Sequence, residues 1–219
     1  MKTKLAIILG IIIVSTIALA VLFLKSVEQE KENKNLVTTQ VDLVSDSDWI
    51  KGKREARVSL IEYSDLQCPA CKVYYPLVKR IVEEFDDSIT FAYRHFPLRS
   101  IHFNSQLASQ ALEAAGKQGK FWQMHDLLFD LQEEWAKVQD PRSLFEKYAQ
   151  NLGLDLAQFK KDLESNQVRD EVEKDYQSAV KAGVNATPTF FINGQKIQNP
   201  KNLEEFKSII QKGIEKSNE

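Results

Sequence analysis

The chain has 219 residues, of which 43% are apolar and 27% are charged, and its net charge at pH 7 is −2. These proportions are close to those of ordinary globular proteins, so they argue against a disordered or fibrous chain. A single domain usually holds roughly 100 to 200 residues, and we therefore expect one domain with additional segments rather than two domains. Because no block of basic residues occurs, nucleic acid is a poor candidate partner.

The N-terminal segment predicts where the chain works. Leu5–Leu24 contains no charged residue and is preceded by Lys2 and Lys4. Its length suits a helix that crosses the roughly 30 Å hydrocarbon layer, and the two lysines favour a cytosolic N-terminus. We therefore predict that residues 1–24 form a signal anchor, a single transmembrane helix in the cell membrane. The rest of the chain is then expected on the extracytoplasmic side.

A cleavable signal peptide is the alternative interpretation of the same segment. Ala18-Leu19-Ala20 has the small-x-small form that a signal peptidase recognises. The apolar run continues past this site to Leu24, however, and exceeds the roughly 7 to 15 residues of a signal peptide's apolar region. Cleavage would give a secreted protein, so both interpretations export the domain.

A polar linker is predicted after the anchor. Residues 25–46 mix both charges with polar side chains and show no periodicity, which is typical of a solvated tether. We expect the folded domain to occupy residues 47–219.

Two strands and one helix are predicted at the start of this domain. Arg57–Ser64 is rich in β-branched and apolar residues and favours a buried strand. Apolar residues recur at helical spacing over Lys72–Phe85, with Pro76 as an expected kink. Ser88–Phe96 is predicted as the second strand.

A long helical segment and a terminal hairpin are predicted next. Residues from about 103 to 182 contain no convincing strand, and glycine or Asp-Pro breakers divide them into about five helices. The helices are expected near 104–117, 121–135, 141–152, 156–165 and 167–181. Asn193-Gly194 favours a type I′ turn between strands at 189–192 and 195–197. An amphipathic helix over 202–214 closes the chain.

The two cysteines of the chain, Cys68 and Cys71, form a C-x-x-C pair between a predicted strand and a predicted helix. A thiolate at a helix N-terminus faces unpaired backbone N–H groups and the positive end of the helix dipole, so its pKa is expected below about 8.5. Pro69 suits a first helical turn, because it lacks an N–H group. Cys68 is nearer the free end of the helix, which predicts Cys68 as the nucleophile and Cys71 as the resolving thiol.

Other roles for the pair are weaker. A zinc site needs about four ligands, and His95, His102 and His125 are scattered without a second pair at ligand spacing. An inert disulfide would close only a very short loop and would stabilise the fold little. Two buried structural thiols fit poorly with the polar neighbours of the pair.

Three motifs resemble those of the DsbA-like thiol:disulfide oxidoreductases, a family of the thioredoxin superfamily. Ile61–Cys71 is similar to the family's first strand and active-site turn, and Tyr93–Leu98 is similar to its second strand. Gly183–Gly194 is similar to its Thr-cis-Pro strand and hairpin. The resemblance extends over roughly Trp49–Gly213. It implies a thioredoxin-like α/β fold with an all-helical insertion between the second and third core strands.

The resemblance also implies roles for individual residues. It implies a redox-active disulfide between Cys68 and Cys71, without a metal or another cofactor. It implies a cis peptide bond before Pro188, packed across from the cysteines. The residues expected to bind substrate are Pro69, Ala70, Thr187 and Pro188.

Glu62 is the third expected catalytic residue. It lies six residues before Cys68 in an otherwise apolar strand, and burial raises the pKa of a carboxyl group. Such a group can exchange a proton with Cys71 during the thiol step. The alternative is that Glu62 points to solvent from the outer face of the strand. For His95 the pattern favours a role in the core.

The predicted function is oxidation of reduced exported proteins by thiol–disulfide exchange at Cys68-Pro69-Ala70-Cys71. The family resemblance implies reoxidation by a membrane partner that passes electrons to a quinone. Ala70 stands where strong oxidases often carry His, which leaves the potential anywhere in a range of roughly 150 mV. A reductase or isomerase with the same site therefore remains an alternative, as does a non-catalytic thioredoxin-fold binding or chaperone domain.

Overall fold

The computed structural model describes residues 41–217 of the chain. The predicted anchor at residues 1–24 and the first part of the predicted linker lie outside these described residues. No helix within 41–217 is both long enough and apolar enough to cross a membrane.

Within the described residues the strands form one five-stranded sheet of order β1-β3-β2-β4-β5. Strands β2 and β3 are parallel, whereas β1, β4 and β5 each run antiparallel to their neighbours. The parallel pair requires a crossover connection, and α2 supplies it. The strands are β1 (Trp49–Gly52), β2 (Val58–Ser64), β3 (Ile89–His95), β4 (Thr189–Ile192) and β5 (Gln195–Lys196).

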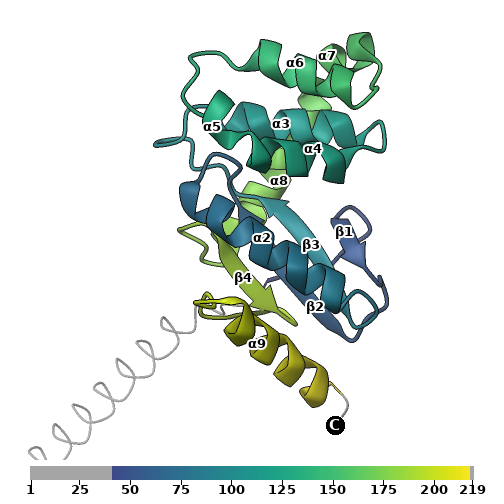
Figure 1. The fold of residues 1–219 in the computed structure, drawn as a ribbon, viewed down its shortest axis with the longest axis vertical. Helices are drawn as coiled ribbons and strands as arrows, with labels where there is room; N and C mark the ends of the chain where they lie inside the picture. Colours follow the sequence, from purple (N-terminus) through teal and green to yellow (C-terminus); the bar gives the residue numbers. More distant parts are fainter. Residues whose placement is uncertain (1–40, 218–219) are drawn as a thin grey trace, which may run out of the picture. The chain divides into compact units, whose positions relative to one another are not determined.

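Helices cover both faces of the sheet. On one face α2 (Pro69–Glu84) packs beside α9 (Leu203–Lys216), and on the other face α8 (Asn166–Lys181) packs against β3. Figure 1 shows the remaining helices gathered beyond one end of the sheet. These are α3 (Ser105–Gly116), α4 (Phe121–Asp130), α5 (Gln132–Trp135), α6 (Arg142–Asn151) and α7 (Leu156–Leu163).

Strand β2 is buried on both faces, which explains its nearly continuous apolar sequence. Leu60 belongs to the core under α2 and α9, whereas Ile61 and Tyr63 belong to the core under α8. This alternation follows from the two-residue period of a strand. Glu62 therefore points to the same side of the sheet as Leu60, towards α2.

Helix α2 begins at Pro69, three residues before the predicted start at Lys72. Cys68 caps the helix with an extended backbone, and Pro69 occupies the first helical position. Pro76 lies inside the helix, as expected. The side chains of Val78, Ile81 and other residues of the helix are buried against the sheet.

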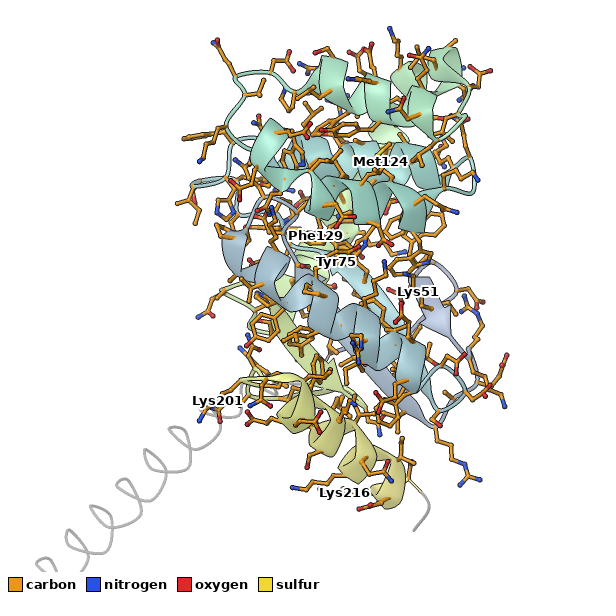
Figure 2. The ribbon with its side chains drawn as sticks, in the orientation of Figure 1. Lys51, Tyr75, Met124, Phe129, Lys201 and Lys216 are labelled. Carbon is orange, nitrogen blue, oxygen red and sulfur yellow. The ribbon has the colours of Figure 1, made fainter. Side chains whose placement is uncertain are left out.

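The helical insertion expected near 103–182 is present, with one difference in its helices. The single helix expected over 121–135 is two helices, α4 and α5, because the chain turns at Leu131. Tyr75 of α2 stacks on Phe129 of α4 with ring centroids 5.2 Å apart (Figure 2). This contact joins the insertion to the helix that begins at the cysteines.

The hairpin between β4 and β5 has the predicted turn. Asn193 and Gly194 both have positive φ, 49° and 80°, as a type I′ turn requires. The Asn193 side chain also accepts a hydrogen bond from the backbone N–H of Ser59 at 2.8 Å. The turn is thereby tied to β2.

The structure differs from the sequence prediction before β2. The predicted linker included residues 41–46, but Val41 is buried in the core under α8 and its N–H donates to Gly194 O. The guanidinium of Arg94 explains this packing, because it donates to the carbonyls of Asp42 and Leu43. Strand β1 was not predicted, since its short sequence carries no clear alternation.

The ion pair between Arg94 and Asp48 fixes this segment to the sheet. The guanidinium donates to both carboxylate oxygens, at 2.7 and 2.9 Å, and each side chain is only 5% exposed. Removal of one partner from such a pair leaves a buried charge without compensation.

We predict that Arg94→Met lowers the free energy of unfolding by about 3 kcal/mol, because Asp48 loses its buried partner. Urea denaturation checks this value. The matched control is Arg142→Met, since the Arg142–Asp140 pair is half exposed on both sides. The control is expected to cost much less, because solvent screens an exposed ion pair. Equal losses in the two variants would contradict the role given to Arg94.

Candidate active site

The two cysteines lie where β2 leads into α2. Cys68 is the N-cap residue of α2 and Cys71 lies one turn further along the helix. The side-chain amide of Gln132 on α5 donates to the carbonyls of Leu66 and Cys68, at 2.7 and 3.1 Å. The helical insertion therefore holds residues 66–68, the loop that leads into the reactive pair. This segment is called the cysteine loop below.

The pKa values of the two thiols are shifted in opposite directions. The pKa of the Cys68 thiol falls to about 5, first because of a hydrogen bond with the Cys71 side chain. The Thr187 side chain and the backbone N–H groups of Ala70 and Cys71 lower it further, against the opposing effect of burial. Burial raises the pKa of Cys71 well above its ordinary value, and the Cys68 thiolate adds to that rise. At neutral pH the pair thus carries one thiolate, on Cys68.

The two cysteines also differ in their exposure to solvent. Cys71 is fully buried, whereas 6% of Cys68 remains exposed. The exposed fraction of Cys68 is smaller than its place at the helix end suggests. Its neighbours Pro69 and Ala70, expected to bind substrate, are exposed. A substrate sulfur can therefore reach the pair only over Cys68.

The loop before β4 completes the surroundings of Cys68. The bond between Thr187 and Pro188 is cis, and the Thr187 carbonyl oxygen lies 3.6 Å from Cys68 Sγ, which donates to it when the thiol is protonated. Both loop residues are buried. The structure thus brings Thr187 and Pro188, expected to bind substrate, beside the nucleophile from a point about 119 residues away in the sequence.

Glu62 points into the protein. It is 3% exposed, so the alternative of a solvent-facing side chain is wrong. Burial raises the pKa of Glu62 to about 7, and its charge raises the pKa of Cys71. Glu62 also lines a cavity of about 20 Å³, which is room for about one water molecule. Glu62 is therefore a buried carboxyl group close enough to Cys71 to affect the pKa of its thiol.

A match to a protein-family model described as thioredoxin covers residues 45–212. The chain belongs to the thioredoxin superfamily. Solved DsbA-family structures with the same fold place it among the DsbA-like proteins. Thiol–disulfide exchange is accordingly the general kind of reaction that the C-x-x-C site of this DsbA-like chain supports.

Three solved structures illustrate the likeness. BdbD from Bacillus subtilis is 26% identical with a TM-score of 0.71, and the match covers 80% of this chain and 97% of BdbD. DsbA2 from Pseudomonas aeruginosa is 25% identical with a TM-score of 0.60, covering 78% of this chain and 96% of DsbA2. α-DsbA1 from Wolbachia pipientis, at 24% identity and a TM-score of 0.71, covers 80% and 94% of the respective chains and shows the fold alone.

Some relatives are longer proteins, and this chain matches only a part of each. The Na⁺/H⁺ antiporter NhaA 3 of Salinispora tropica is 35% identical over 178 residues, which are 81% of this chain and 26% of that protein. NhaA of Herminiimonas arsenicoxydans is 36% identical over 69% of this chain and 23% of its own length. The chain thus spans about a quarter of the length of these relatives. Antiport is an activity named for those longer proteins and is not assigned to this chain.

In the DsbA-like site His102 has a partner, Asp65, that the sequence pattern does not indicate. The Asp65 carboxylate is fully buried directly before the cysteine loop, and His102 Nδ1 donates to it at 2.7 Å. The hydrogen bond raises the pKa of His102 first of all, and the Cys68 thiolate raises it further. The two residues are 37 positions apart, so no local pattern revealed the pair.

The other two histidines belong to the core. His95 is fully buried, and its Nε2 lies 3.0 Å from Glu113 Oε1, in agreement with the predicted core role. Burial lowers the pKa of His125, which pairs with Asp126. Among residues 41–217, no three His, Cys, Asp or Glu side chains are grouped as metal ligands would be.

Exposed apolar side chains surround the cysteine loop. Ile101 is 63% exposed and Phe103 is 84% exposed, on either side of His102. The next residue, Asn104, donates its backbone N–H to the side chain of Gln67 at 2.8 Å. Phe103 is therefore held between two residues that bind the cysteine loop. Val73 on α2 is also exposed.

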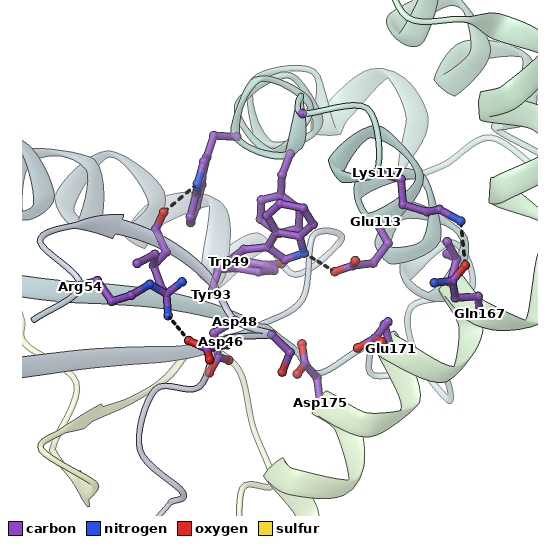
Figure 3. Close-up of a pocket in the computed structure, with 16 residues that line it drawn as sticks. Asp46, Asp48, Trp49, Arg54, Tyr93, Glu113, Lys117, Gln167, Glu171 and Asp175 are labelled. Carbon is purple, nitrogen blue, oxygen red and sulfur yellow. Dashed lines mark hydrogen bonds and ion pairs between the residues drawn. The ribbon is translucent and has the colours of Figure 1, made fainter.

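A separate cavity of about 600 Å³ lies between β1, α3 and α8 (Figure 3). Its lining is largely paired with itself: Trp49 donates to Glu113, and Lys117 donates to Gln167. Neither cysteine lines it. The cavity is therefore separate from the cysteine site.

We predict that alkylation of Cys68 by iodoacetamide follows a titration with a midpoint near pH 5, because the thiolate is the reacting species. The reduced protein is assayed between pH 4 and 8, with Cys71→Ser as a control that isolates Cys68. Cys71→Ala, which removes the side-chain donor altogether, is expected to raise the midpoint, because the hydrogen bond from Cys71 is the largest cause of the lowered pKa. A midpoint near 8.5 in the unaltered protein would contradict the assignment.

Proposed function

We propose that this DsbA-like chain is an extracytoplasmic dithiol oxidase that introduces disulfides into exported proteins. The observation that carries the proposal is the low pKa of Cys68, about 5, beside a buried Cys71 whose pKa is raised. This value lies between roughly 7 for thioredoxin and roughly 3.5 for a strong oxidase. A stabilised thiolate favours the reduced enzyme, so the oxidised enzyme readily accepts electrons.

The reaction proceeds in two exchanges. A substrate thiolate attacks Sγ of Cys68 in the Cys68–Cys71 disulfide, which forms a mixed disulfide and releases Cys71 as a thiolate. A second substrate thiolate then attacks the substrate sulfur of the mixed disulfide and releases Cys68 as a thiolate. The substrate loses two electrons and gains a disulfide, while the enzyme gains the two electrons and leaves as a dithiol.

Glu62 supplies the proton that Cys71 needs. Because burial strongly disfavours a Cys71 thiolate, the leaving sulfur must be protonated as the disulfide breaks. With a pKa of about 7, Glu62 holds a proton in part of the population at neutral pH. A water molecule in the cavity beside it can return the proton.

An unfolded polypeptide is the substrate that fits the surface around Cys68. Ile101, Phe103 and Val73 expose apolar surface beside the cysteine loop. Newly exported chains present apolar segments before they fold, and burial of one phenylalanine contributes roughly 1.5 to 3 kcal/mol. The exposed Pro69 and Ala70 leave the approach to Cys68 open.

The proposed location follows from the N-terminal sequence. Leu5–Leu24 with its preceding lysines favours an anchor that keeps the domain at the outer side of the membrane. Since each cycle leaves the enzyme reduced, an electron acceptor must reoxidise it. A membrane partner linked to quinone is the acceptor we propose, and the anchor would hold the domain close to it.

The function is tested by the oxidation of a reduced, unfolded protein with two cysteines. The oxidised enzyme is expected to form the substrate disulfide in one stoichiometric turnover, whereas Cys68→Ser is expected to form none. Cys71→Ser is also expected to form none, since a single thiol at Cys68 cannot hold the disulfide that accepts the two electrons. An equilibrium potential near −270 mV against glutathione would contradict the oxidase and support a reductase. Unchanged activity in Cys68→Ser would support a non-catalytic domain instead.

We predict that Phe103→Ser lowers kcat/KM for the unfolded protein about tenfold, because an apolar contact worth about 1.4 kcal/mol is lost. The rate with a small thiol such as glutathione is expected to stay the same. Leu43→Ser is the matched control, since Leu43 is 64% exposed and lies beside the Asn193–Gly194 turn. A tenfold loss with glutathione as well would place Phe103 in the structure of the site rather than in substrate binding.

A further inference from the structure

Asp65, which also contacts Gln67 and Cys71, holds the His102 ring by a hydrogen bond. Nδ1 of His102 lies 2.7 Å from Asp65 Oδ2, and only 15% of the His102 side chain is exposed. A carboxylate can only accept hydrogen bonds, so Nδ1 carries the hydrogen. Nε2 is then the ring atom that gains or loses a proton, and the ring alternates between a neutral and a positively charged form.

Asp65 connects this ring to the loop that carries the cysteines. Its carboxylate accepts hydrogen bonds from the backbone N–H groups of Gln67 and Leu98, at 2.7 and 2.8 Å. Its own N–H donates to Sγ of Cys71 at 3.5 Å. The carboxylate is fully buried and has three donors, so its position relative to the cysteines is fixed.

We propose that His102, positioned by Asp65, provides a positive charge that stabilises the Cys68 thiolate and so makes the disulfide more oxidising. This inference deepens the proposed function and rests on it for its biological meaning. His102 acts as a positioning and electrostatic residue, because the bonds that form and break lie between sulfur atoms. Ala70, the exposed residue between Pro69 and Cys71, offers no charge for this purpose.

The charges that act on the His102 ring come from two elements. The Asp65 carboxylate follows β2, and the Cys68 sulfur lies at the start of α2. Both favour the charged ring, and burial opposes them. Arg99 is the nearby cation of the same loop, but its guanidinium is bound to Gln106 and to Glu173 on α8, at 2.8 and 2.6 Å.

The coupling between sulfur and imidazole is reciprocal. Reduction of the disulfide places a negative charge on Cys68, so His102 binds its proton more tightly in the reduced protein than in the oxidised protein. Two electrons and one proton, on Cys71, enter with the reduction, and His102 takes up a further fraction of a proton. The contribution of His102 requires a thiolate, hence a pH above about 5.

The upper limit of this pH window is set by His102 itself. A histidine whose pKa is raised contributes fully below its ordinary value of about 6.5, and the contribution is lost as the pH rises through the raised pKa. The stabilisation is therefore expected to be full only in a narrow acidic range between the two limits. It fades in alkaline solution.

The test compares His102→Gln with the unaltered protein by three measurements. The pKa of Cys68, followed by the ultraviolet absorbance of the thiolate, is expected to rise in the variant. The equilibrium constant with glutathione at pH 6 is expected to shift about threefold towards the oxidised enzyme, and less at alkaline pH. In the unaltered protein, NMR titration of the His102 ring is expected to give a higher pKa in the reduced state.

Arg99→Gln is the matched control, since it removes a cation from the same loop without touching Asp65. It is expected to leave the pKa of Cys68 and the glutathione equilibrium unchanged. An equal effect of both variants, or the same His102 pKa in both redox states, would overturn the inference. That failure is distinct from failure of the oxidase, which shows as absence of substrate oxidation in the unaltered protein. Asp65→Asn offers a second route, because it is expected to lower the pKa of His102 while leaving the ring in place.

Discussion

The start of α2 places a negative sulfur where the backbone can stabilise it. The N–H groups of Ala70 and Cys71 face Sγ of Cys68, and the Cys71 thiol donates a further hydrogen bond. When the disulfide forms, the Cys68 sulfur loses its negative charge and the Cys71 thiol loses its hydrogen. The free energy of the reduced state therefore depends on this one charge. The fold supplies the helix end, the loop of Thr187 and the helices that hold the cysteine loop.

The helical insertion contributes to the site through fixed contacts rather than through reacting groups. Gln132 of α5 binds two carbonyls of the cysteine loop, and Asn104 binds the side chain of Gln67. These contacts place His102 and Phe103 at the rim of the site. The insertion thus does two things for the thioredoxin-like sheet. It fixes the reactive loop, and it presents apolar and basic groups around the loop.

Local sequence patterns predicted most of the elements, and they missed what depends on distant pairing. The Asn193-Gly194 turn and the C-x-x-C pair at a helix start are short-range signals, and both lie where they were expected. The pairs Arg94–Asp48 and His102–Asp65 join segments 46 and 37 residues apart, so periodicity carried no information about them. The sequence allows Glu62 to be either buried or exposed to solvent, because a strand sequence alone does not say which face of the sheet is covered.

The central claim is that folding stabilises the Cys68 thiolate, and the stability of the two redox forms tests it most directly. The pKa of Cys68 in the folded protein is far below that of an unfolded cysteine, so the stabilisation appears above about pH 5 and grows towards pH 8.5. Urea denaturation of both forms at pH 7 and pH 4 measures it. The reduced protein is expected to be the more stable form at pH 7, with that advantage lost at pH 4. An oxidised protein that is equally stable or more stable at pH 7 would contradict the account.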